Sequence, residues 1–184
     1  VSYYGIAKTG AVVNPISAML TPEEVRYTVT DSGARAVVAT PDKGSSLLDM
    51  KGAANLADVV LWGETSVTGA TMLSDWLQRG TAEFALHPRK ASDLAAICYT
   101  SGTTGHPKGA MQSHRAVVGA AVGTALMAAR TSQDRVINAL PLPHVYGSCV
   151  FNAAMMAGST LILIPRFNEV TVLTAIAEHK ATLM

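Results

Sequence analysis

The sequence YTSGTTGHPKGAMQSH, residues 99–114, interrupts an apolar chain with glycines, small hydroxyl side chains, a proline and a lysine. The residues before it, Leu94–Thr100, form a continuous apolar run that is typical of a buried strand. The residues after it predict a helix over Ser113–Arg130, with Ser113 as its N-cap. Open α/β sheets bind ligands in loops between such a strand and such a helix. We therefore expect residues 99–114 to contain a functional loop.

The residue types in this loop suit a bound anion. Glycines permit positive φ and leave room for successive backbone N–H groups to turn toward one negative charge. Hydroxyl groups add donors, a proline stiffens the turn, and a lysine brings a mobile positive charge. Together they predict a cradle for a polyphosphate. The residues concerned are Gly102, Gly105, Gly109, Ser101, Thr103, Thr104, Pro107 and Lys108.

The loop differs from the common P-loop of nucleotide-binding proteins. The pattern Gly-x-x-x-x-Gly-Lys-Ser/Thr would require glycine at Pro107 and a hydroxyl side chain at Gly109. A polar surface loop without a ligand is the alternative, because clusters of glycine, serine and threonine commonly form such loops. The buried strand, the lysine and the order of the residues favour a nucleotide site with a different chemistry.

Short runs rich in valine and isoleucine alternate with helical patterns along the chain. Near-continuous apolar runs are typical of parallel strands covered by helices, which predicts an α/β fold with mainly parallel sheets. Helices are predicted from the Thr21–Glu24 capping box to a stop at Gly33, and over residues 72–78 and 169–179. In the helix of residues 113–130, Gly119 and Gly123 predict the close approach of another backbone. The expected strands are AVVNPI (11–16), RAVVAT (35–40), DVVLWG (58–63), LAAICYT (94–100), RVINAL (135–140) and STLILIP (159–165).

The composition excludes several classes of protein. Because 14 Lys and Arg balance 13 Asp and Glu to a net charge of +1, we expect no nucleic-acid partner. Cys98 and Cys149 lack the paired spacing of a zinc site, and we expect buried thiols in a reducing compartment. Residues 136–165 carry no charged side chain, but prolines and glycines interrupt them. We therefore expect buried strands and a helix there, and no transmembrane segment.

We expect the chain to be part of a longer protein. It begins without methionine or a signal-type segment, and its last residues start a strand that needs a neighbour. The expected location is the cytoplasm, with peripheral attachment to a membrane as the alternative. Apolar faces left without their partners would promote self-association.

The order of residues in YTSGTTGHPKG, residues 99–109, resembles the phosphate-binding signature of the adenylate-forming enzymes. This superfamily includes acyl- and aryl-CoA synthetases, luciferases and the adenylation domains of nonribosomal peptide synthetases. The similarity extends to AKTGAVVNPI (7–16), SDLAAICYTSG (92–102) and LPLPHVYG (140–147), whereas His106 occupies a position at which the family varies freely. The chain thus resembles part of the large N-terminal AMP-binding domain, truncated at both ends and without the C-terminal domain. The resemblance implies a phosphate loop of Thr100, Ser101, Gly102, Thr103, Thr104, Gly105, Lys108 and Gly109.

The reaction that this resemblance implies explains the residue types. A carboxylate attacks the α-phosphate of ATP and pyrophosphate leaves, so donors and a lysine around the β- and γ-phosphates would offset the repulsion between anions. The thiol of CoA then captures the acyl-adenylate as a thioester. The resemblance also implies Mg²⁺, with the metal-binding glutamate beyond Met184. We therefore expect the 184-residue chain alone to be catalytically inactive.

His144 is the second candidate site residue. A histidine among apolar residues is more often a core residue with one satisfied hydrogen bond than a catalytic group. In the CoA-forming enzymes that LPLPHVYG resembles, the matching histidine or aromatic residue lies beside the carboxylate pocket and the bound phosphates. The resemblance therefore implies that His144 is a catalytic-site residue bordering the acyl pocket. Pro143 replaces the usual phenylalanine and leaves the acyl chain length open.

The LPLPHVYG stretch also favours one subfamily. Amino-acid-activating domains usually carry a Phe-Asp pair here, so the resemblance implies an acyl-CoA synthetase for a fatty or other acyl acid. Other functions stay open: an amino-acid adenylation domain that loads a carrier protein, a nucleotide-binding module without turnover, and a structural domain without affinity for ATP.

Overall fold

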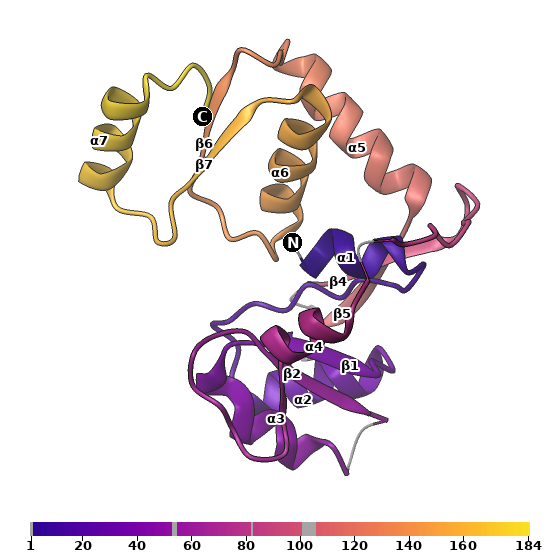
Figure 1. Ribbon diagram of the computed structural model, residues 1–184. Coiled ribbons are helices and arrows are strands. Elements are labelled where there is room, and N and C mark those ends of the chain that lie inside the picture. Colours follow the sequence, from indigo (N-terminus) through magenta and orange to yellow (C-terminus); the bar gives the residue numbers. More distant parts are fainter. Residues whose placement is uncertain (1, 53–54, 82, 101–105) are drawn as a thin grey trace. The chain divides into compact units, whose positions relative to one another are not determined.

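The computed structural model describes residues 2–52, 55–81, 83–100 and 106–184 of the chain (Figure 1). The chain divides into two compact units. The first comprises Val1–Pro88 and Tyr99–Ala110, and the second comprises Arg89–Cys98 and Met111–Met184. Each unit has its own parallel sheet, which confirms the predicted α/β class. That the whole chain is part of one larger domain stays a prediction.

The sheet of the first unit has the strand order β1-β2-β3, and both strand pairs are parallel. The strands are β1 (Ala36–Ala39), β2 (Asp58–Leu61) and β3 (Thr71–Met72). The central strand β2 is buried from Val59 to Leu61. Its continuous apolar run thus forms the middle of a parallel sheet, as the sequence predicts.

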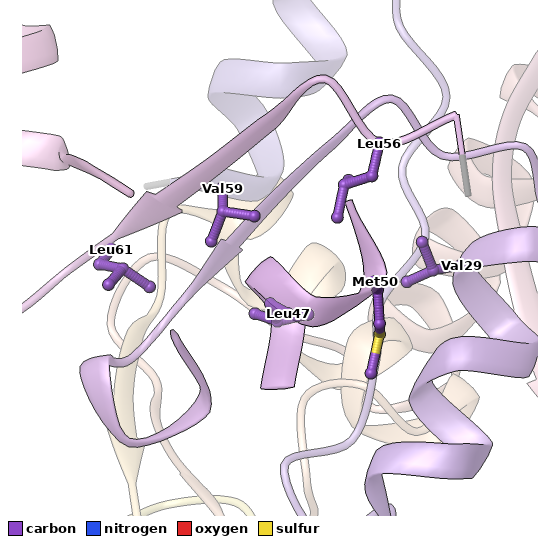
Figure 2. Close-up of a cluster of buried hydrophobic side chains, with 6 residues drawn as sticks. All are labelled: Val29, Leu47, Met50, Leu56, Val59 and Leu61. Atoms are coloured by element: carbon purple, nitrogen blue, oxygen red, sulfur yellow. The ribbon is translucent and has the colours of Figure 1, made fainter. Parts of the chain in front are cut away.

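Side chains of α2, α3 and β2 form the hydrophobic core of this unit (Figure 2). The helices are α1 (Ser2–Lys8), α2 (Pro22–Asp31), α3 (Gly44–Met50) and α4 (Leu73–Arg79), with a 3₁₀ turn η1 (Pro41–Lys43) before α3. Each fully buried aliphatic side chain contributes about 1.5–3 kcal/mol of transfer free energy to stability. The buried members of the core are Val29, Leu47, Met50, Leu56, Val59 and Leu61.

Helix α2 begins and ends as predicted. Thr21 Oγ1 accepts a hydrogen bond from the Glu24 N–H at 3.3 Å, and the Glu24 carboxylate accepts one from the Thr21 N–H at 2.8 Å. This capping box satisfies backbone donors that the first turn of a helix leaves without partners. Gly33, just beyond the helix, has a φ of +63°, which glycine adopts without strain.

The second unit is built on the parallel pair β6 (Arg135–Asn138) and β7 (Thr160–Leu163). Val136 forms a further parallel bridge with Leu183. Helix α6 (Val145–Ala157) connects the two strands, α7 (Glu169–His179) follows β7, and α5 (His114–Met127) packs along α6 (Figure 1). The buried core cluster against β6 consists of Ile137, Ile164, Val172 and Ala175.

The charge-free segment of residues 136–165 therefore forms strand, loop, helix and strand, as predicted. Within the described part of the chain, every helix is too short or too polar to span a bilayer. Both cysteines are free: Cys98 is buried and Cys149 is half-buried. The prediction of a buried thiol is thus confirmed for Cys98 and only partly for Cys149.

The strands β4 (Leu94–Thr100) and β5 (Lys108–Ser113) form a hydrogen-bonded pair of their own, with residues in both units. Residues 101–107 are too few for the crossover that parallel neighbours need, so β4 and β5 run antiparallel. The predicted direct passage from loop to helix is wrong, because β5 intervenes. The sequence of β5 has few strand-forming residues, and pairing with β4 overrides that weak propensity.

Two other sequence predictions are also wrong. Residues 11–16 form only an isolated bridge at Val13 and no strand, since Pro15 has no N–H to donate to a sheet. Among the described residues, Gly119 and Gly123 do not bring another backbone close, because a Cβ added at either position would meet no described atom within 4 Å. The N-cap predicted for the same helix is confirmed, since Ser113 Oγ accepts from the Ala116 N–H at 3.2 Å.

Candidate active site

The described flanks of the predicted phosphate loop lie at one end of the β4–β5 pair. Thr100 is the last residue of β4 and Lys108 is the first residue of β5, and both are exposed. Gly109 follows in β5 and is half-buried. Because the two strands are antiparallel, Thr100 and Lys108 lie at the same end of the pair. The remaining members, Ser101, Gly102, Thr103, Thr104 and Gly105, lie outside the described residues.

Aromatic and acidic side chains hold the residues on either side of this loop. The Tyr99 hydroxyl donates a hydrogen bond to Asp31 Oδ2 at 2.6 Å. The rings of Tyr27 and Tyr99 meet edge to face, with centroids 6.4 Å apart and an interplanar angle of 85°. Tyr27 also stacks on His106, with centroids 5.2 Å apart and an angle of 18°.

The environment of Tyr99 keeps its hydroxyl protonated. Burial is the first cause that raises the pKa of Tyr99, and the hydrogen bond to the Asp31 carboxylate is the second. Both act in the same direction because the phenolate would lose hydration and would face a negative charge. The hydroxyl is thus a stable donor at neutral pH.

Sequence reasoning did not identify Tyr27, Asp31 or His106 as residues of the site. Tyr27 and Asp31 are four positions apart on α2, a spacing that places both side chains on one face of the helix. That spacing does not reveal which segment this face contacts. The partner of Asp31, Tyr99, lies 68 residues further along the chain.

His144 is the N-cap of α6 and not a core residue. Its Nδ1 accepts a hydrogen bond from the Tyr146 N–H at 3.2 Å, and its side chain is exposed. An accepting Nδ1 is a neutral imidazole nitrogen, so Nε2 carries the proton. The place of His144 beside an acyl pocket stays a prediction.

Gly147 allows the turn before α6 to lie close against the helix. The Pro141 carbonyl accepts a hydrogen bond from the His144 N–H at 3.0 Å. A Cβ at Gly147 would lie 2.9 Å from the carbonyl carbon of Pro141, closer than real contacts allow. At the start of the turn, Asn138 Oδ1 accepts from the Leu140 N–H at 3.1 Å. The LPLPHVYG stretch is therefore a compact turn that orients His144 at the helix start.

The free thiols of Cys98 and Cys149 are not activated as nucleophiles. Burial raises the pKa of the Cys98 thiol and also that of the Cys149 thiol. Raised thiol pKa values disfavour the thiolate that nucleophilic catalysis needs. Among the described residues, no group of three or more His, Cys, Asp or Glu side chains could hold a metal ion.

The chain combines parallel sheets with a sequence between β4 and β5 that is rich in glycine and hydroxyl side chains, and comparison with known sequences identifies its class. The whole chain, residues 1–184, matches the sequence profile of the family described as AMP-binding enzyme. The chain belongs to this family.

Similar proteins include CoA ligases whose chains are longer than this one. The long-chain-fatty-acid–CoA ligase FadD13 of Mycobacterium tuberculosis is 33% identical over 97% of this chain and 35% of its own length. The 4-coumarate–CoA ligase 5 of Oryza sativa subsp. japonica is 30% identical over 100% of this chain and 34% of its own length. ATP-bound MatB from Rhodopseudomonas palustris has a TM-score of 0.85 and 31% identity, covering 99% of this chain and 35% of that one. The chain thus spans about a third of the length of the relatives that it matches.

Proposed function

We propose that the intact gene product is an ATP-dependent acid–thiol ligase of the acyl-CoA synthetase type. It would convert a carboxylic acid and ATP to an acyl-adenylate and pyrophosphate, and then transfer the acyl group to CoA with release of AMP. One observation carries this proposal: the signature YTSGTTGHPKG stands in the sequence from the end of β4 to the start of β5, in a chain of the AMP-binding family. Relatives named as CoA ligases support the choice of thiol acceptor.

The chemistry of the first half-reaction assigns a role to the described residues of the loop. The carboxylate and the triphosphate are both anions, and the departing pyrophosphate gains negative charge. The exposed residues Thr100 and Lys108 end β4 and begin β5, and their hydroxyl and ammonium groups would bind the β- and γ-phosphates. Preorganised donors of this kind typically contribute about 10²–10³-fold to a rate.

The acid that the protein activates is proposed to be a fatty or other acyl acid. FadD13, the relative at 33% identity, is named for long-chain fatty acids. His144 would border the acyl group, where its Nε2 proton is available because Nδ1 already accepts a hydrogen bond from Tyr146. Pro143, in the turn before α6, and exposed Tyr146, in the first turn of α6, would influence the acyl chain length.

The Mg²⁺ ion of the proposed reaction is not assigned to residues of this chain. The described residues offer no cluster of acidic or histidine ligands for it. The role proposed for this chain's own residues is to bind the phosphates.

Carboxylate-dependent exchange between ATP and labelled pyrophosphate tests the proposal. The intact gene product is assayed with a panel of fatty, aromatic and amino acids, and CoA thioesters are then detected by mass spectrometry. Exchange with an acyl acid, followed by formation of its CoA thioester, is the expected result. Lys108→Ala should lower exchange by about 10²–10³-fold, whereas Lys51→Ala, at an exposed lysine after α3, should not.

Other outcomes of this assay would contradict the proposal. Exchange only with amino acids, and transfer to a carrier protein in place of CoA, would indicate an adenylation domain. Binding of ATP without exchange for any acid would indicate a nucleotide-binding module. Equal exchange rates for the Lys108→Ala variant and the wild type would contradict a role of the phosphate loop in the reaction.

A further inference from the structure

A cluster of four side chains in the first unit joins helix α2 to both sides of the phosphate loop. Asp31 binds the Tyr99 hydroxyl at 2.6 Å, and Tyr27 meets the ring of Tyr99 and stacks on His106. Tyr99 immediately precedes residues 100–105 and His106 immediately follows them. One helix face therefore contacts the chain where it enters the loop and where it leaves it.

The cluster is separate from the hydrophobic core of the unit. Tyr27 and Tyr99 are half-buried and His106 is exposed, whereas the core side chains lie around β2. An exposed stacked pair and a partly exposed hydroxyl–carboxylate hydrogen bond contribute little to global stability compared with core burial. Such contacts instead fix the local direction of the backbone that carries them.

We propose that Tyr27 and Asp31 are positioning residues, which hold the two flanks of the phosphate loop in the arrangement that binds the ATP phosphates. The inference rests on the proposed function, since it concerns the nucleotide of that reaction. Asp31 sets the end of β4 through Tyr99, and Tyr27 sets the start of β5 through His106. Neither residue needs to contact ATP, because a loop whose ends are held loses less conformational entropy on binding.

Direct binding of ATP to the intact gene product tests this inference. Isothermal titration calorimetry with ATP, in the absence of acid and CoA, is carried out on Tyr27→Ala, His106→Ala and Asp31→Ala. Each variant should raise the Kd for ATP about three- to tenfold, the range expected for one aromatic pair or one hydrogen bond. Tyr27→Phe keeps both ring contacts and should restore the affinity. Arg26→Ala, at an exposed position on the same helix, is the control.

Comparison of the KM for ATP with the KM for the acid distinguishes a positioning role of these residues from a general loss of protein stability. In the exchange assay the KM for ATP should rise while the KM for the acid stays unchanged, because only the phosphate flanks are altered. Loss of folded protein would lower the rate without changing either KM. His106→Ala covers the case in which Tyr27→Ala fails to fold, since His106 is exposed.

A double-mutant cycle gives a further outcome. Tyr99→Phe and Asp31→Ala remove the same hydrogen bond, so their effects on the Kd for ATP should not add. Unchanged ATP affinity in His106→Ala and Asp31→Ala, with exchange still dependent on Lys108, would overturn the inference and leave the proposed function intact. Absence of Lys108-dependent ATP binding in the wild type would instead overturn both.

Discussion

The hydrogen bond from Tyr99 to Asp31 makes the stability of the first unit depend on pH. The pKa of Tyr99 lies above its usual value of 10.0 because of burial and the facing carboxylate. A raised folded-state pKa means that the contribution to stability is complete below about pH 10 and is lost as the pH rises further. Alkaline conditions should therefore weaken this contact.

Tyrosinate absorbance as a function of pH tests this expectation. In the folded wild type, one tyrosine should resist ionisation until the protein unfolds, and Tyr99→Phe should remove that late step. The free energy of unfolding should fall less steeply above about pH 10 in Tyr99→Phe than in the wild type. Identical titration curves for the two proteins would show that the Tyr99 hydroxyl is not held as the structure indicates.

At the residue scale, the sequence identifies groups by type but not by partner. The glycines, hydroxyls and Lys108 of the loop suggest phosphate chemistry because each supplies a donor or conformational freedom. Tyr27 and His106 carry no such signal, since an aromatic residue on a helix is usually a packing residue. Their stacking depends on the path of the chain over about eighty residues, which local patterns do not encode.

Helices α5 and α6 both contain glycines, and the structure assigns them opposite roles. In α6, a Cβ at Gly147 would press against the Pro141 carbonyl. Gly147→Ala should therefore lower the free energy of unfolding by about 1–3 kcal/mol, the usual cost of overpacking. Urea unfolding followed by circular dichroism measures this change.

Gly119→Ala in α5 is the matched substitution. A Cβ at Gly119 would meet no atom within 4 Å, so alanine should stabilise the helix by about 0.5–1 kcal/mol through its higher propensity. The same loss of stability in both variants would contradict the packing of the LPLPHVYG turn against α6.

At the element scale, the sequence predicted those helices whose caps and apolar periodicity are strong local signals. The predicted helix of residues 169–179 agrees with α7, and Ser113 caps α5 as expected. Strand β5 escaped prediction because its sequence, KGAMQS, has no apolar run and depends on its pairing with β4. Residues 11–16 gave the opposite error, since this apolar run contains Pro15 and forms only the bridge at Val13.

At the scale of the whole molecule, two helices of the second unit, α5 and α7, expose large apolar side chains. Leu126 at the end of α5 is 74% exposed and Leu173 on α7 is 65% exposed. We expect the isolated 184-residue chain to self-associate, because exposed apolar surface of this kind drives association. Sedimentation velocity should show species larger than the monomer as the concentration rises.

Charge substitutions locate the surfaces responsible. Leu126→Glu together with Leu173→Glu should shift the 184-residue chain toward the monomer, whereas Gln133→Glu, at an exposed polar position, should leave the distribution unchanged. A chain that is monomeric at every concentration would show that these side chains do not drive association.

The central claim is that residues 100–109, between β4 and β5, bind the phosphates of ATP. A crystal structure of the intact gene product with ATP bound tests this claim most directly. We predict the β- and γ-phosphates within hydrogen-bonding distance of residues 100–109, with the Lys108 ammonium group among their contacts. Phosphates bound at another place, with Lys108 directed away from them, would contradict the assignment.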